Sequence, residues 1–282
     1  MKKTAFVTFI KSMSILLFLT MIVGVNIIVA AEAKPEKQPL NKELLEQYGS
    51  KVEINYLIPR PSVIAEILHQ NQFKFTGEIN PEKNNNYAGS VKIALNLGSR
   101  CTDGIMMVYG EKKSSDQALE DLGDTILKLT ADLGLENNLK GIDPLKGALK
   151  SKKQDEIKNS IDTLFAESEL FLRQRDDNDL AMLVSLGGWI EMMYYASGEL
   201  STNYQTQSSK VLAQDYIVDV YINALSKLKI FVQESPVLLT ITRQLPEVKR
   251  LMDNPTDQPI SQEAVKGIYA IAKNLKLEIE KQ

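Results

Sequence analysis

The sequence predicts an all-α fold, either a multi-helix bundle or an irregular helical array. From about residue 90 onward, apolar residues recur at steps of three and four, the spacing that places them on one face of a helix. Ser, Asp and Pro stand where these patterns begin, and short polar segments join them. The hydrophobic content of 44% is sufficient for a packed core and is not typical of a disordered chain.

The first 33 residues have the pattern of a secretory signal peptide. Lys2, Lys3 and Lys11 lead into an apolar run from Met13 to Ala31, and Ala33 completes a small-x-small cleavage motif. The run is longer than the usual apolar region of about 7–15 residues and reaches the ~17–25 residues of a spanning helix. Two interpretations therefore fit the sequence, a signal peptide that is cleaved and a signal anchor that is retained. Both interpretations predict export to the periplasm or cell envelope, and only the anchor predicts attachment to a membrane.

The remaining chain divides into an extended, Pro-containing segment at residues 34–61 and a single helical domain at residues 62–282. Pro59 and Pro61 end a short alternating run, and Pro61 suits the start of a short helix that continues to Gln70. Gly134 is expected to end one of the later helices, and Pro246 to break or kink another. The main helical patterns cover Val91 to Val108, Leu119 to Leu133, Ile157 to Phe171, Asn178 to Ala196, Ile217 to Phe231, a segment after Ser235-Pro236, and Ala264 to Ile279.

Two parts of the chain resemble each other. Leu97-Gly98 followed by Met106-Met107 is similar to Leu186-Gly187 followed by Met192-Met193, and a polar joint and a regular helix follow each copy. Two pseudo-repeated helical hairpins would explain the similarity, and chance similarity between helices rich in Met and Gly would explain it too.

Composition excludes several classes of function. The formal net charge is −3, and the chain becomes more acidic without its N-terminal lysines, which argues against nucleic acid as a partner. A single cysteine, Cys101, cannot form an intramolecular disulfide and is expected to be a buried apolar residue. The single histidine, His69, excludes a histidine-rich metal site but not a site built from carboxylates. No catalytic, phosphate-binding or haem-attachment motif is present, so neither a cofactor nor a metal is expected.

Four glycines inside helical patterns are unusual, because each costs about 1 kcal/mol relative to Ala in a helix interior. They are Gly98, Gly104, Gly187 and Gly188. Such residues permit a close helix–helix crossing, leave room for a ligand beside Trp189, or mark a break in the helix.

Glu191 is the only charged residue in the apolar stretch from Leu180 to Ala196. If its side chain points inward it needs a partner, since buried carboxylates are rare unless paired, and Arg100 or Lys92 is the natural candidate. Arg100 and Asp103 share a polar stripe that faces either the solvent or an internal polar cluster. The candidate ligand-binding residues are therefore Arg100, Asp103, Gly187, Gly188, Trp189 and Glu191, and no residue is assigned as catalytic.

From Tyr56 to Ser235 the chain resembles a group of uncharacterised, exported helical proteins of bacteria. The resemblance is carried by the stretches 93–98, 103–104 and 183–189, and by Pro59-x-Pro61 before a short helix. It implies an exported all-helical fold and carries over no reaction, ligand or catalytic residue.

Three functional hypotheses remain. The leading one is an exported, non-enzymatic helical protein that binds a partner protein or a small apolar ligand. The second is a cell-envelope enzyme that uses Glu191 and Asp103 as acid and base. It requires that both carboxylates converge, that their pKa values are perturbed, and that they line an accessible cleft. The third is a scaffold anchored to the membrane by an uncleaved N-terminal segment.

Overall fold

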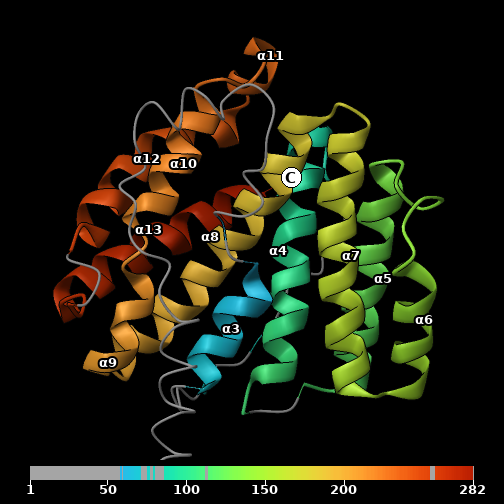
Figure 1. The fold of residues 1–282 in the computed structure, drawn as a ribbon, viewed down its shortest axis with the longest axis horizontal. Helices are drawn as coiled ribbons and strands as arrows, with labels where there is room; N and C mark the ends of the chain where they lie inside the picture. The colour runs from blue at the N-terminus through green and yellow to red at the C-terminus, as the bar shows by residue number, and fades with distance from the viewer. Residues whose placement is uncertain are drawn as a thin grey trace, which may run out of the picture. The chain divides into compact units, whose positions relative to one another are not determined.

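The computed structural model describes residues 58, 60–70, 75, 76, 79, 86–111, 114–254 and 258–281. These residues belong to one compact unit that spans residues 54–282. They are all-helical, as predicted, with no strand and with nine packed helices of ten or more residues (Figure 1). The expected signal segment and most of the Pro-containing segment lie outside the described residues.

The helix boundaries follow the order of the predicted patterns. The described helices are α3 (Pro61–Gln70), α4 (Ser90–Tyr109), α5 (Asp116–Asp132), α6 (Ile142–Ser151), α7 (Gln154–Gln174), α8 (Asn178–Thr202), α9 (Thr206–Ser209), the 3₁₀ helix η2 (Lys210–Leu212), α10 (Asp215–Leu225), α11 (Ile230–Gln233), α12 (Pro236–Met252) and α13 (Gln262–Glu280).

Local signals fix several of these ends. Ser115 precedes α5, and its hydroxyl accepts a hydrogen bond from the Ala118 N–H at 3.1 Å, which satisfies one of the free donors of the first turn. Gly134 follows α5 with a φ of +67°, the left-handed conformation that ends many helices. Pro236 occupies the first position of α12, where a missing N–H costs nothing.

The structure differs from the predicted elements in several places. The segment expected as one helix from Ile217 to Phe231 is divided into α10 and α11 by a turn after Leu225. Helix α6 was not predicted, because Pro144 and Gly147 lie inside its short apolar pattern. Pro246 does not end α12, which continues to Met252; this proline lies on the exposed side of the helix.

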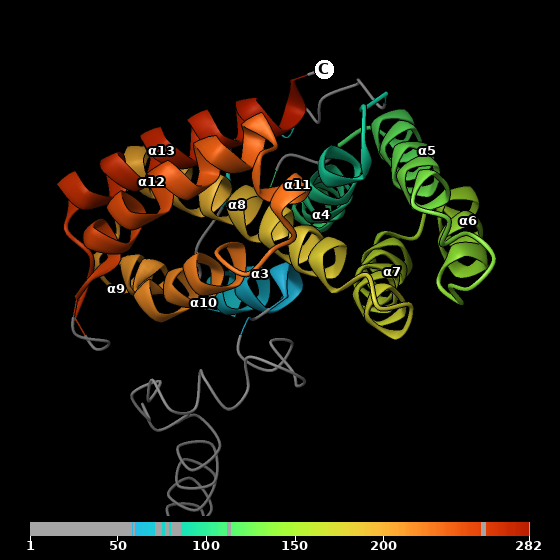
Figure 2. The same ribbon diagram turned by 90° about the horizontal axis from the view of Figure 1, so that it is seen from above.

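Helix α8 lies at the centre of the described unit. It is apolar on all sides and packs against α3, α4, α7 and α13, as expected for a helix buried around its whole circumference. Figures 1 and 2 show α5, α6 and α7 on one side of the α4–α8 pair and α10, α12 and α13 on the other. No helix in the described ranges is both long and apolar enough to span a bilayer.

The α4–α8 contact depends on glycine. A Cβ atom added to Gly98 would lie 1.9 Å from the Val184 carbonyl oxygen, and one added to Gly187 would lie 2.0 Å from the Leu95 carbonyl oxygen. Both distances are far below van der Waals contact. The atoms that an added Cβ would meet belong to the backbone of the facing helix, which cannot rotate away as a side chain could. The two helices therefore touch backbone to backbone, and the close-crossing interpretation is correct for Gly98 and Gly187.

These contacts are also reciprocal. When the two similar parts of the chain are aligned, Gly98 corresponds to Gly187 and Leu95 to Val184. The contact of Gly98 with Val184 is therefore equivalent to the contact of Gly187 with Leu95. Around them, α7 packs on α4 and α6 on α7, while α13 packs on α8 and α12 on α13. The correspondence is partial, because α7 also packs on α8, and α5 packs on α4 without a comparable contact of α10 on α8.

We predict that Gly98→Ala will strongly destabilise the protein, by several kcal/mol, since the added methyl group must force two backbones apart. Gly147→Ala is the matched control, because a Cβ added to this helical glycine would meet nothing within 4 Å. The control should be neutral or more stable by up to about 1 kcal/mol, because Ala favours helix. Chemical denaturation of both variants measures the difference, and equal stabilities would contradict the proposed backbone contact.

Candidate functional site

Among the described residues, five side chains that carry a formal charge gather where α4, α8 and α13 meet. We call them the ion cluster: Arg100 and Asp103 from α4, Glu191 from α8, and Lys276 and Glu280 from α13. The side chains of Arg100, Asp103 and Glu191 are at most 1% exposed, and those of Lys276 and Glu280 are 12% and 9% exposed. Charged groups this deeply buried require partners, because burial removes their hydration.

Each member of the ion cluster has at least one partner. Lys276 Nζ lies 2.7 Å from Glu191 Oε1 and 2.7 Å from Glu280 Oε1, so it bridges two carboxylates. Arg100 pairs with Glu280, and its NH1 lies 3.2 Å from Asp103 Oδ2. The cluster thus ties the last turn of α13 to both central helices.

Two hydroxyl groups complete the surroundings of the carboxylates. The Tyr195 hydroxyl donates to Asp103 Oδ1 at 2.5 Å. The Ser99 hydroxyl lies 2.6 Å from Glu191 Oε2 and donates to it. The carboxylates are therefore held by neutral donors as well as by the two cations.

Burial changes the acid–base properties of this site. Desolvation, followed by the charge of Asp103, raises the pKa of Glu191 to about 7, and Lys276 only partly opposes this. For Lys276 itself, desolvation lowers the pKa, but the nearby carboxylates outweigh it and raise the pKa above its usual value. The same balance raises the pKa of Arg100. Both bases therefore remain charged, while Glu191 titrates near neutrality.

The structure decides between the alternatives for the polar residues. Arg100 and Asp103 face the interior, so the solvent-facing interpretation of their stripe is wrong. Glu191 is buried and pairs with Lys276, which the sequence does not single out. Of the two predicted partners, Arg100 acts on Glu191 through its charge, and Lys92 instead donates to the Lys281 carbonyl at 2.6 Å. Lys276 and Glu280 stand four residues apart, a spacing also typical of exposed helix pairs, so no sequence signal distinguished them.

The other candidate residues, Gly187, Gly188 and Trp189, lie beside the cluster on α8. A Cβ added to Gly188 would lie 3.0 Å from the Phe165 ring and 3.2 Å from Pro61 Cγ, so protein atoms already fill the space next to it. The Trp189 indole N–H donates to Gln214 Oε1 at 2.9 Å. The glycines thus bring helices together, and the tryptophan is anchored by a residue that lies between η2 and α10.

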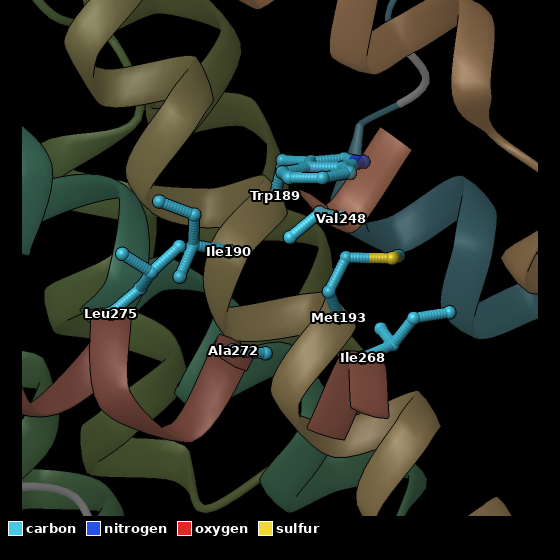
Figure 3. A pocket seen from close by; sticks show the side chains of 7 residues that line it. All are labelled: Trp189, Ile190, Met193, Val248, Ile268, Ala272 and Leu275. Atoms are coloured by element: carbon cyan, nitrogen blue, oxygen red, sulfur yellow. The ribbon is translucent and has the colours of Figure 1, made fainter. Parts of the chain in front are cut away.

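Trp189 also borders a small apolar cavity between α8, α12 and α13 (Figure 3). The cavity volume is about 10 Å³, which is room for roughly one water molecule. A ligand of drug-like size needs a pocket of ~300–1,000 Å³. The lining side chains are Trp189, Ile190, Met193, Val248, Ile268, Ala272 and Leu275.

A buried carboxylate outside the ion cluster lies at the α7–α8 interface. Glu169 is 7% exposed, and desolvation raises its pKa to about 7, opposed by Arg173 and by a hydrogen bond with Ser185. The Ser185 and Tyr221 hydroxyls lie 3.1 Å apart. This group was not predicted, because α7 carries many charged residues and Glu169 does not stand out among them in the sequence, as Glu191 does in α8.

Cys101 is fully buried, and burial raises the pKa of its thiol, so the expected apolar role is confirmed. Within the described residues, no group of three or more His, Cys, Asp or Glu side chains is placed to hold a metal ion.

Comparison with known proteins adds no relative. Neither a protein-family model, nor a characterised protein, nor a solved structure matches this chain. The site must therefore be interpreted from its own geometry.

The geometry meets two of the three requirements for acid–base chemistry by Asp103 and Glu191. The two carboxylates converge, and the charge of Asp103 contributes to the raised pKa of Glu191. The third requirement is access, and both side chains are at most 1% exposed and engaged by protein partners. In this conformation the carboxylates link helices and are closed to solvent.

We predict that Arg100→Met will lower the free energy of unfolding by about 3–5 kcal/mol, since it leaves Asp103 and Glu280 buried without their shared cation. Arg250→Met is the matched control, because Arg250 pairs with Glu247 on the exposed side of α12. Thermal and urea denaturation should show little change for the control. An Arg100→Met curve that superimposes on the wild-type curve would contradict the structural role of the cluster.

Proposed function

We propose that the protein is exported to the periplasm or cell envelope and acts there as a non-enzymatic helical protein that binds a partner protein. The observation that carries this proposal is that both candidate sites within the described residues are already filled by protein groups. The ionisable groups of the ion cluster pair with one another, and the cavity beside Trp189 has a volume of only about 10 Å³. Recognition is therefore assigned to the outer surface, and a partner protein is preferred to a small apolar ligand.

Export is supported by the N-terminal pattern of three lysines, an apolar run and Ala31-x-Ala33. A cleaved signal would release the helical unit, whereas a retained segment would make the protein an anchored scaffold. The helical unit would bind its partner in the same way in both cases.

Mass spectrometry tests both export and the preference for a protein partner. The sample is the full-length chain, expressed with its own N-terminus and recovered from the envelope fraction. We expect a denatured mass that begins at Glu32 or Lys34; a full-length mass would instead support the anchored scaffold. Under native conditions we expect no additional small-molecule mass. A small molecule that is lost on denaturation would contradict the preference for a protein partner.

The partner itself requires a surface-specific measurement. Cross-linking in intact cells, followed by identification of the linked residues, should yield one reproducible partner joined through exposed positions. Links that are random in partner and position, and that persist with heat-denatured protein, would count against the proposal.

A further inference from the structure

We propose that the ion cluster is a pH-sensitive latch that holds the last turn of α13 against α4 and α8, and that loss of one proton from the cluster loosens this turn. The latch is a property of the helical unit and does not rest on the identity of any partner.

The number of charges in the cluster favours one retained proton. The cluster holds three carboxylates, Asp103, Glu191 and Glu280, and two cations, Arg100 and Lys276. With all five groups ionised, it carries one net negative charge in a region that solvent barely reaches. An uncompensated buried charge is costly, and one retained proton removes it.

Glu191 is the carboxyl best placed to carry that proton. Ser99 Oγ lies 2.6 Å from its Oε2, and Lys276 Nζ lies 2.7 Å from its Oε1. A hydroxyl can accept as well as donate a hydrogen bond. Protonated Glu191 can therefore donate to Ser99 through one oxygen and still accept from Lys276 through the other.

The remaining carboxylates are less suited to hold the proton. Glu280 accepts from Lys276 and pairs with Arg100, and Asp103 accepts from Tyr195 and lies beside Arg100. The titratable, charged and hydroxyl groups that face Glu191 come from each of the three helices that meet at the cluster. They are Ser99, Arg100 and Asp103 from α4, Lys276 and Glu280 from α13, and Tyr194 and Tyr195 from α8 itself.

Polar contacts also concentrate at the last turn of α13. Besides the ion pairs, Asn96 Nδ2 donates to the Ile279 carbonyl at 2.8 Å, and Lys92 Nζ donates to the Lys281 carbonyl. These donors satisfy carbonyl groups that a helix C-terminus leaves without an intrahelical partner. Weakening the cluster therefore acts directly on the end of this helix.

The direction of the pH effect follows from the pKa of Glu191, which burial and Asp103 raise from 4.5 to about 7. The closed latch keeps the proton, and the opened, hydrated carboxyl releases it. The stabilisation is therefore complete below about pH 4.5, decreases as pH rises, and is lost once pH passes about 7.

Hydrogen exchange of the full chain, corrected for the pH dependence of intrinsic exchange, tests the latch. Between about pH 5 and pH 7.5 we expect the opening constant of the last turn of α13 to rise roughly tenfold to a hundredfold. Helix α5, which contributes no residue to the cluster, should change little. Equal protection of α13 at both pH values would overturn the proposal.

Glu191→Gln keeps the shape of the neutral carboxyl and cannot release a proton, so it should abolish the pH dependence at α13. Glu247→Gln, which removes an exposed carboxylate on α12, and Glu169→Gln, which removes the buried carboxylate on α7, should both leave it intact. Full pH dependence in Glu191→Gln, or its loss in either control, would overturn the assignment to Glu191.

A measurement on the wild type covers the case in which Glu191→Gln does not fold. Infrared spectroscopy should detect a protonated carboxyl that disappears over the same pH range in which exchange at α13 increases. Glu169→Gln identifies and removes the contribution of the carboxyl at the α7–α8 interface, whose pKa burial also raises to about 7. Absence of any remaining titrating band would overturn the latch.

Discussion

The direct contact between the backbones of α4 and α8 is the constraint on which the other packing depends. Without a Cβ at Gly98 and Gly187, the two helix axes approach until carbonyl oxygens occupy the space of the missing side chains. Each of these glycines costs about 1 kcal/mol of helix propensity, and the close approach offsets it through dense contacts along both helices. The remaining long helices pack around this pair.

The same close approach explains why charged groups can be tolerated inside. Ser99 on α4 pairs with Glu191 on α8, and Asp103 pairs with Tyr195. Both members of the second pair lie four residues further along their helices than those of the first. The two helices therefore run in the same direction, in a fixed register. Replacing such buried ion pairs by apolar residues is often neutral or stabilising, so their contribution here is better understood as fixing which residues face each other.

The sequence predicts helix positions well where one local signal dominates, as at Gly134 and Pro236. It fails where signals compete. Pro246 is an expected breaker, yet it lies on the exposed side of α12, where tertiary contacts elsewhere on the helix outweigh the lost hydrogen bond. In the site, an isolated charge in an apolar pattern identified Glu191, but its partner Lys276 depends on how α13 folds back, and that is not encoded by local spacing.

The parallel arrangement of α4 and α8 has a consequence for how the chain is made. A parallel neighbour cannot be reached by a tight turn, so α5, α6 and α7 all intervene before α8 can meet α4. Contacts between segments so distant in sequence are slow to form, because loop closure must precede them. Until α8 is available, the apolar residues of α4 that it covers stay open to water, and a chain interrupted after α7 would present a surface prone to aggregation.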